Sequence, residues 1–414
     1  MSKPLSRPKR KNPLQRTRLP LLPHGQRSRK AHGLTAAAAE GRFMLQVCED
    51  CSHTLYPVRD ACPHCLGINL PFRDVRPDGR LVVETTVRIS TDPYFRERTP
   101  WRVGTVQLDA GPLVIAHLHG DAVEGERVRL SLKLDKSGAA VMIALPAVET
   151  PDMQADPILR EMTCDPQFRR VLITDGRTAV GQAMAKAFCE AGASIVFVGI
   201  SNAWKPYPGM DQLAALEQVE IVPLDVTDSQ SIADLAAQNG GRIDIVINTA
   251  EHVRAGGIIG RGSVIEAREE MDVRYFGLMR MAQSFGPALR FRGADGQSSA
   301  AAFVNLLSVH ALMNWPSFGA HSATEAACLS AAQCLRAELR PGGVKVLNVF
   351  FGPLETEWFQ TVPPPKLAPS LLAKAVVQAL RQGLEDAFVG DIAQDIRERL
   401  AANPKALERE LGDA

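Results

Sequence analysis

The chain has 414 residues, of which 47 are Lys or Arg and 46 are Asp or Glu, so its formal net charge is +1 at pH 7. This length predicts two or three domains, and the near-neutral charge gives no overall attraction to nucleic acid or acidic membranes. The longest apolar runs are no longer than a strand, and no cleavable apolar leader follows the basic start of the chain. We therefore expect a cytoplasmic protein without a membrane span.

The first segment, residues 1–33, is expected to be a basic disordered tail. No acidic residue precedes Glu40, and a stretch of prolines and basic side chains buries too little apolar surface to fold alone. Such a tail can bind nucleic acid, dock on an acidic partner or keep the chain soluble. We favour the last two interpretations, although the sequence leaves all three open.

Four of the eight cysteines predict a metal site within residues 34–70. Cys48, Cys51, Cys62 and Cys65 form two CxxC pairs with ten residues between them. Two such turns facing each other provide four thiolates for a tetrahedral, structural zinc ion. Two disulfides would require an oxidising compartment that nothing else indicates. His53 and His64 stand nearby, but four cysteines leave them no role as ligands.

Residues 71–148 are expected to form a small β-barrel or sandwich. Apolar residues alternate along short segments that Gly and Asp turns separate. His117 and His119 share one face of a segment, where we expect solvent-facing side chains rather than ligands. The expected strands are 80–89, 101–109, 112–120, 126–135 and 139–146.

The order of these motifs resembles a known family over residues 34–148. A CxxC pair, then "YPVR", then "CPHC", then five strands with "PY" and "PW" in a loop is similar to the zinc-ribbon/OB-fold proteins associated with thiolases. The resemblance implies a rubredoxin-like zinc ribbon and an OB fold that pack on a thiolase-like, aldolase-like or hydratase-like partner and help to form its acyl-CoA site. Residues 149–168 lack periodicity and are expected to be a linker.

From residue 169 to 414 the pattern changes to buried strands followed by amphipathic helices. This alternation predicts a doubly wound parallel sheet of Rossmann type. "VLITDGRTAVG", "LDVTD", "INTAEH" and "FFGPLETEW" resemble the motifs of the short-chain dehydrogenase/reductase family. The resemblance implies that Asp225 contacts the adenine ring and Thr356 the nicotinamide carboxamide. The positions it assigns to cofactor binding are Thr174, Gly176, Gly181, Asp225, Asn248 and Thr356.

The first glycine-rich turn departs from that family. Asp175 and Ala179 stand where glycines would let the backbone approach a diphosphate. A carboxylate a few Å from two phosphates repels them more strongly than the helix dipole attracts them, although Gly176 could partly compensate through a shifted turn. The segment after the second strand offers neither an acid for a ribose diol nor a basic residue for a 2′-phosphate. These changes argue against NAD(P) binding.

The catalytic positions depart further. The family tetrad of Asn, Ser, Tyr and Lys corresponds here to Arg274, Ser308, His321 and Glu325. A glutamate reverses the field by which the lysine lowers the pKa of the tyrosine. We therefore expect no catalytic residues and no hydride transfer. The alternative is an active oxidoreductase in which His321 moves the proton and Glu325, four residues later, orients it.

The resulting hypothesis is a bridging subunit in acyl-CoA catabolism. Its zinc-ribbon/OB part would dock a thiolase or aldolase-like enzyme, and its reductase-like part would pair with an active 3-hydroxyacyl-CoA dehydrogenase through two helices at 266–290 and 321–339. The second helix is rich in Ala, Ser and Cys, which suits either an interface or a buried core helix. A nucleic-acid-binding zinc ribbon is a further alternative, against which the barrel strands offer few aromatic residues for stacking. Residues 387–414 are expected to be helical.

Overall fold

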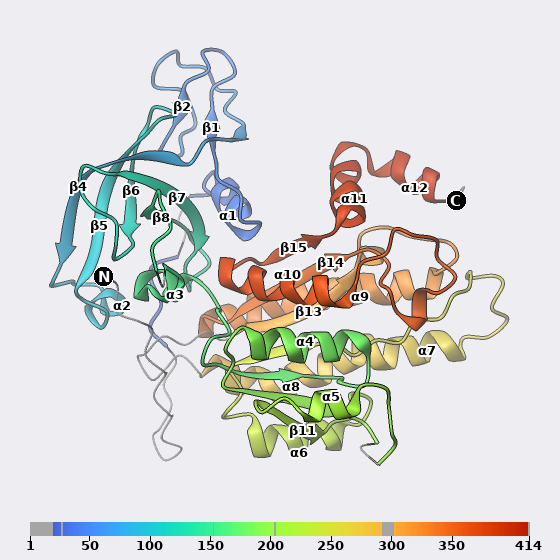
Figure 1. The fold of residues 1–414 in the computed structure, drawn as a ribbon. Coiled ribbons are helices and arrows are strands. Elements are labelled where there is room, and N and C mark those ends of the chain that lie inside the picture. The colour runs from blue at the N-terminus through green and yellow to red at the C-terminus, as the bar shows by residue number, and fades with distance from the viewer. Residues whose placement is uncertain (1–19, 26–27, 152, 203, 292–301, 413–414) are drawn as a thin grey trace.

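The computed structural model describes residues 20–25, 28–151, 153–202, 204–291 and 302–412. Most of the predicted tail lies outside these ranges. At its described end Pro23 is buried, and His24 Nε2 lies 3.4 Å from the Asp92 carboxylate. The described chain forms a zinc-ribbon and barrel lobe beside a larger α/β domain (Figure 1). No helix in those ranges combines the length and apolarity that crossing a bilayer requires.

The zinc ribbon follows a short helix and is built on a three-stranded antiparallel sheet in the order β2-β1-β3. The buried Gln46 in the central strand holds the loop that leads into the second CxxC pair, because its amide donates to Arg59 O (3.0 Å) and accepts from Arg59 N (2.8 Å). The elements are α1 (His32–Ala39), β1 (Met44–Val47), β2 (Thr54–Leu55) and β3 (Phe72–Asp74).

The next five strands close into a barrel in the order β4-β5-β6-β8-β7. Alternation places Leu81, Val106 and Leu118 inside, where each is fully buried. The five predicted strands are therefore confirmed, and the architecture is a closed barrel. The elements are β4 (Asp78–Val87), α2 (Pro93–Arg96), β5 (Trp101–Leu108), β6 (Leu113–Leu118), β7 (Arg127–Leu134) and β8 (Ala140–Pro146).

The segment expected to be a linker contains a 3₁₀ turn at Met153–Ala155 and the helix α3 (Pro157–Met162). The helix packs Leu159 and Met162 on the outer side of the barrel, against Trp101. Its Glu161 accepts hydrogen bonds from Tyr94 OH (3.1 Å) and pairs with Lys136 Nζ (3.0 Å). Burial alone would raise the pKa of Glu161, but the neighbouring cations hold it below its ordinary value.

The α/β domain contains a seven-stranded parallel sheet in the order β11-β10-β9-β12-β13-β14-β15. Its central strands are buried on both faces, as continuous apolar runs predict. Helices α4 and α10 cover one face, and α6, α8 and α9 cover the other. The strands are β9 (Arg170–Ile173), β10 (Ile195–Ile200), β11 (Val219–Pro223), β12 (Ile245–Asn248), β13 (Ala302–Ser308), β14 (Lys345–Phe351) and β15 (Asp386–Val389).

The helices agree with the predicted pattern apart from two differences. The helix expected over 266–290 is interrupted by a π-helical turn at Asp272–Phe276, and the end expected to be helical begins with strand β15. The helices are α4 (Ala179–Glu190), α5 (Met210–Ala214), α6 (Ser229–Asn239), α7 (Ile265–Met271), α8 (Gly277–Arg290), α9 (Gly319–Leu339), α10 (Pro369–Gln382), α11 (Asp391–Ala402) and α12 (Pro404–Gly412).

The barrel contacts the α/β domain where β14 and β15 begin. Lys345, the first residue of β14, donates from Nζ to Leu134 O (2.9 Å), and Lys133 Nζ donates to Gln382 O (2.7 Å). Glu385 N donates to Ala39 O (2.8 Å). The barrel therefore sits at the edge where these strands start, whereas nucleotide sites in doubly wound folds form where strands end.

Candidate functional site

The four predicted metal-binding cysteines come together in the zinc ribbon. Their Sγ atoms all lie within 4.8 Å of one another, with 3.5 Å between Cys48 and Cys65 and 3.6 Å between Cys51 and Cys62. Zn–S bonds of about 2.3 Å in a tetrahedron place sulfurs about 3.7 Å apart, so the residues fit one zinc ion. Because all four ligands are protein thiolates, the zinc would hold the fold and activate no substrate.

The histidines of this lobe have other contacts. The rings of His53 and His64 stack with centroids 5.7 Å apart on the exposed surface. His117 Nδ1 accepts from Trp101 Nε1 (2.8 Å), and burial lowers the pKa of His117 to about 4. His119 is fully buried and bonds Met153 O (2.9 Å). The expectation that His117 and His119 face solvent is therefore wrong, because the linker segment covers that face of the barrel.

The residues predicted to bind a cofactor lie at the carboxyl ends of strands β9, β11, β12 and β14, along one edge of the sheet. Thr174, at the end of β9, accepts from Thr249 N (2.9 Å) and donates to Asn248 Oδ1 (3.3 Å), which joins the ends of β9 and β12. Asp225, beyond β11, accepts from Thr227 N (2.9 Å). Thr356 lies beyond β14, and its buried hydroxyl makes no hydrogen bond to a described residue. Parallel strands bring their carboxyl ends to this one edge.

The two glycines that remain in the first turn are required by packing. A Cβ added to Gly176 would lie 2.1 Å from Val198 Cγ1, and one added to Gly181 would lie 1.8 Å from Asp175 O. Both positions therefore hold the turn and α4 against the sheet. Asp175 and Ala179 replace the other two glycines of the family turn, and these replacements leave the packing intact.

Four side chains near this edge were not expected from the sequence. Arg177 donates from Nη1 to Ser201 O (3.2 Å), directly beyond β10, and its guanidinium lies 6.0 Å from the ring centre of Tyr207. The Tyr207 hydroxyl is buried without a hydrogen-bond partner among the described residues. Glu251 replaces the last glycine of the Asn-x-Ala-Gly turn, and burial raises its pKa to about 7. The fourth is His310.

The residues at the family's catalytic positions lie close together, and two of them, Arg274 and Glu325, bond each other. Arg274 Nε donates to Glu325 Oε1 (2.7 Å), and its other nitrogens donate to Ala250 O (2.8 Å) and Leu306 O (2.7 Å). Glu325 Oε2 accepts from Ser308 N (2.7 Å). Burial by itself would lower the pKa of Arg274, but Glu325 more than offsets it and raises that pKa. The pair is buried and its hydrogen bonds are satisfied, so it is a closed structural unit.

His321 stands apart from this pair. It is 1% exposed, and neither ring nitrogen bonds to a described residue. Burial, with Arg274 nearby, lowers its pKa to about 3, so the ring is neutral. Its ring lies 5.0 Å from that of His310, whose Nδ1 is hydrogen-bonded to Ser308 Oγ at 2.6 Å. Sequence spacing offered a His321–Glu325 contact, but Glu325 bonds Arg274 instead.

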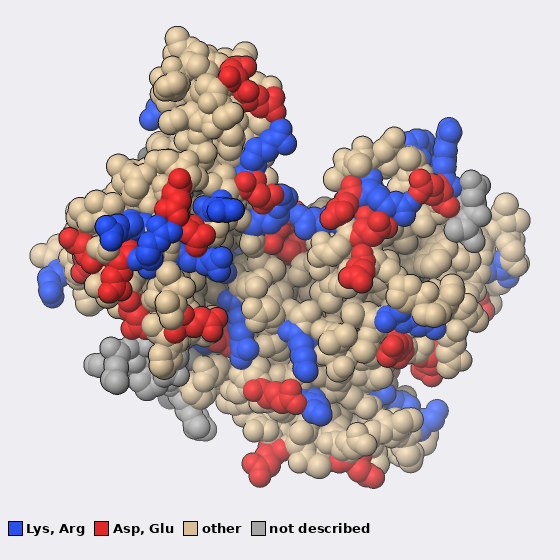
Figure 2. Space-filling view, turned by 45° about the horizontal axis from the view of Figure 1, so that its top comes forward, with Lys and Arg blue, Asp and Glu red and all other residues tan. Residues whose placement is uncertain are grey.

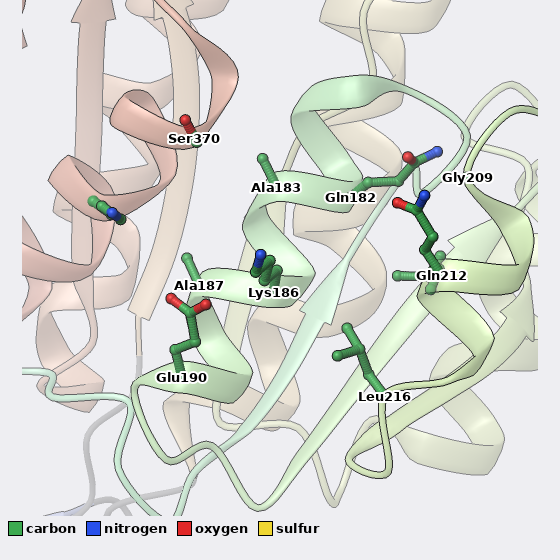
Figure 3. A pocket seen from close by; sticks show the side chains of 11 residues that line it. Gln182, Ala183, Lys186, Ala187, Glu190, Gly209, Gln212, Leu216 and Ser370 are labelled. Carbon is green, nitrogen blue, oxygen red and sulfur yellow. The ribbon is translucent and has the colours of Figure 1, made fainter.

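Two cavities lie near this domain's helices. One of about 420 Å³ lies between α4, α5 and α10; Figure 3 shows Lys186 and Glu190 on its α4 side. The other, about 560 Å³, is lined by Trp315, Ile258 and Ile259 among others. Trp315 stacks on His310 with ring centres 5.4 Å apart, so this second cavity adjoins the catalytic positions.

Comparison with known proteins agrees with this geometry. The family model for the short chain dehydrogenase matches residues 169–366. The chain is 31% identical over 217 residues to an uncharacterized oxidoreductase of Staphylococcus aureus, covering 51% of this chain and 90% of the relative. The chain belongs to the short-chain dehydrogenase family. The short-chain dehydrogenase ptmH of Penicillium ochrochloron is 32% identical over 209 residues, or 47% of this chain and 68% of that protein.

The first lobe of the chain matches two further models. The ChsH2 rubredoxin-like zinc ribbon domain matches residues 35–70, and the ChsH2 C-terminal OB-fold domain matches residues 72–133. The predicted fusion of a zinc-ribbon/OB part to a short-chain dehydrogenase part is therefore confirmed.

Solved short-chain dehydrogenases resemble the α/β domain. One from Burkholderia cenocepacia, in complex with NADP, is 32% identical with a TM-score of 0.54, covering 60% of this chain and 98% of that one. Another from Streptomyces avermitilis is 26% identical with a TM-score of 0.50, covering 59% and 96%. Arg177 lies beside the end of β10, so the expectation that no basic residue is available there for a 2′-phosphate is wrong.

Proposed function

We propose that this chain is a non-catalytic bridging subunit of an acyl-CoA catabolic complex. Its zinc-ribbon and barrel lobe would dock a thiolase or aldolase-like enzyme, and its α/β domain would pair with an active 3-hydroxyacyl-CoA dehydrogenase. The observation that carries the proposal is the buried Arg274–Glu325 ion pair at two of the four family catalytic positions.

The chemistry of these positions opposes hydride transfer. A reductase needs a proton donor next to the carbonyl and a cation that favours the donor's anionic form. Here the cation Arg274 is neutralised by Glu325. His321 is neutral and enclosed by aromatic rings. Ser308 is 1% exposed, and its hydroxyl is engaged by His310. No described group at these positions is poised to donate a proton to a substrate.

The barrel offers a surface that suits a protein partner. Val83, Thr105 and Ile115 are direct neighbours across β4, β5 and β6. Val83 and Ile115 are 51% and 68% exposed, and Leu113 on the same strand as Ile115 is 54% exposed. Covering such apolar area stabilises a complex by about 25 cal/mol per Å² before association costs. This face supports the docking of the thiolase or aldolase-like enzyme, with acyl-CoA at the interface.

The α/β domain offers a second surface along α9. Ala323, Ala326 and Ser330 are exposed at helical spacing, next to the exposed Ile258 and Ile259. Small side chains let a second helix approach closely, and the two isoleucines add apolar area. This face supports pairing with the dehydrogenase subunit.

Co-purification tests the bridging role. Tagged chain from its native host should retain both enzymes. Ile115→Asp should release only the thiolase or aldolase-like enzyme, and Ala326→Arg should release only the dehydrogenase, so each variant serves as the other's control. Recovery of the wild-type chain without either enzyme would reject the proposal.

The competing function is an NAD(P)-dependent oxidoreductase that uses His321, and the dehydrogenase relatives favour it. Under that hypothesis the purified chain reduces 3-ketoacyl thioesters with NADPH, and His321→Ala abolishes the rate. A nucleic-acid role has less support, because on the face in Figure 2 basic and acidic side chains are interspersed rather than gathered into a basic patch.

A further inference from the structure

A hollow lies between α4, α5 and α10, among the helices that cover one face of the sheet (Figure 3). Its volume of about 420 Å³ falls in the range of small-molecule sites, roughly 300–1,000 Å³. Ala183 and Ala187, one helical turn apart on α4, form an alanine floor where longer side chains would fill the space. Leu213 and Leu216 add apolar surface from the α5 side. None of the residues predicted to bind a cofactor lines this hollow, so it is separate from the dinucleotide cleft at the strand ends.

The wall of the hollow on the α5 side is held in place by α4. Gln182 Nε2 donates to Pro208 O at 2.7 Å, directly before Gly209, the N-cap residue of α5. Gly209 has a φ of +82°, and a Cβ added there would lie 2.2 Å from Gln182 Oε1. Glycine therefore lets the chain pass close to α4 in this conformation. Because these contacts fix the start of α5 against α4, the hollow exists before a ligand binds, which lowers the entropic cost of binding.

Two ammonium groups line the hollow from different helices. Lys186 belongs to α4 and Lys374 to α10, and neither makes a hydrogen bond or an ion pair with a described residue. Ser370, one turn before Lys374, adds a hydroxyl. One exposed lysine is ordinary, but two unpaired lysines at one apolar hollow suit a phosphate, whose oxygens ammonium groups bind well. The carboxylate of Glu190 also lines the hollow and reduces this positive charge without cancelling it.

We propose that this hollow binds an organic phosphate, with the phosphate between Lys186 and Lys374 and the apolar or planar body on the alanine floor. In the acyl-CoA complex proposed above, the ligand of this chemistry is the nucleotide end of coenzyme A, and this identification rests on the proposed function. Helices α4 and α10 cover one face of the sheet and α9 covers the other. Pairing through α9 therefore leaves the hollow accessible, so the chain would hold the nucleotide end of a thioester whose acyl end the docked enzymes process.

Isothermal titration of the full-length, zinc-loaded chain with adenosine 3′,5′-bisphosphate, a fragment of coenzyme A, tests the site. Lys186→Ala and Lys374→Ala should each weaken binding by about tenfold or more, because each removes a charged hydrogen-bond donor. Lys186→Arg keeps the charge and should stay within about threefold of wild type. Glu190→Gln removes a neighbouring negative charge and should tighten binding by about twofold to fivefold.

Two further variants separate the floor from the charges. Ala183→Leu fills the hollow without changing any charge and should abolish binding. Lys405→Ala removes an exposed lysine of α12 and should leave the Kd unchanged. Inorganic phosphate alone should bind wild-type chain at least about tenfold more weakly than the bisphosphate, because it has no body to cover the alanine floor.

The site is overturned if wild-type chain does not bind the bisphosphate, or if binding survives both lysine-to-alanine variants, which would place the ligand in another cleft. Inorganic phosphate that binds as tightly as the bisphosphate would overturn the role of the floor. Co-purification tests the bridging function separately. A chain that binds the bisphosphate through both lysines but recovers neither enzyme keeps the phosphate site and loses only its assignment to coenzyme A.

Discussion

The buried Arg274–Glu325 pair is expected to contribute strongly to the stability of the fold. Together they satisfy Ala250 O, Leu306 O and Ser308 N. Removing one partner leaves a buried charge without compensation, which costs about 3–5 kcal/mol. We expect Arg274→Ala to lower the free energy of unfolding by that amount in urea denaturation. Lys405→Ala breaks the exposed Lys405–Glu408 pair and should change stability by less than about 0.5 kcal/mol.

A change of less than about 1 kcal/mol in Arg274→Ala would contradict the closed ion pair. Arg274→Ala combined with Glu325→Ala should recover part of the loss, because no unpaired charge then remains. That recovery would distinguish the loss of a charge partner from a general packing defect.

Glu251 makes stability depend on pH in a defined direction. Its pKa is raised to about 7 in the folded chain from an ordinary 4.5, so the folded state favours the protonated carboxyl. The stabilisation that the protonated Glu251 carboxyl gives the folded chain is present below about pH 4.5 and is lost as pH rises through about 7. Glu251→Gln should therefore stabilise the chain by about 1–2 kcal/mol at pH 8, and by less at pH 5. Chemical denaturation at both pH values measures this.

The exposed Glu190 on α4 provides the control for this titration. Glu190→Gln should give the same small change in stability at pH 5 and pH 8. An equal effect of Glu251→Gln at the two pH values would show that the Glu251 carboxyl titrates as it does in the unfolded chain.

At the residue scale, sequence reasoning located positions but not contacts. Spacing identified Ser308, His321 and Glu325; Glu325 does contact Ser308 N, whereas His321 packs on His310. The partner of Glu325 is Arg274, 51 residues away, and helical spacing to His321 could not reveal it. His310 was missed although it follows Ser308 by two residues, because a histidine at a strand end has no signature until Ser308 Oγ lies 2.6 Å from its ring.

At the scale of elements, the zinc ribbon depends on its ligands more than on its apolar core. Its sheet has strands of four, two and three residues, which is too little to fold without metal. Cys62→Ser should reduce the zinc content from about one ion per chain to less than about 0.2. Hydrogen exchange should then become fast in β1 to β3, while the buried strands β12 to β14 stay protected.

Cys334→Ser is the matched control, since Cys334 is an exposed residue of α9 without metal spacing. It should retain the zinc and the protection of the ribbon. A zinc-free Cys62→Ser chain with a protected ribbon would mean that packing on the barrel is sufficient to hold it.

The elements that sequence reasoning found or missed differ in the strength of their pattern. Strands with alternating or continuous apolar residues were predicted even where they have only four residues, as β9 and β12 do, and so was α4, which starts at the N-cap Thr178. Strand β15 begins with Asp386 and runs into a charged helix, so its parallel pairing with β14 comes from tertiary packing. No periodic sequence pattern indicates the π-helical turn around Arg274.

At the scale of the whole molecule, the two lobes should unfold together. Lys345 is buried at the start of β14 and donates to Leu134 O, and Lys133 donates to Gln382 O. Burial lowers the pKa of both lysines, for Lys133 to about 8. Each ammonium therefore depends on its interdomain acceptor, and each hydrogen bond from a charged donor contributes about 1.5–3 kcal/mol to holding the lobes together.

Scanning calorimetry of the zinc-loaded chain should accordingly show one cooperative transition. Lys345→Ala removes the donor to Leu134 O and a buried alkyl stem, so the lobes lose part of their coupling and the transition should broaden or divide. Lys186→Ala, on the exposed side of α4, should leave the single transition unchanged. Two separate transitions in the wild-type chain would mean that the lobes are independent bodies. A bridging subunit would then hold its two enzymes at a variable distance, whereas a coupled fold holds them at a fixed one.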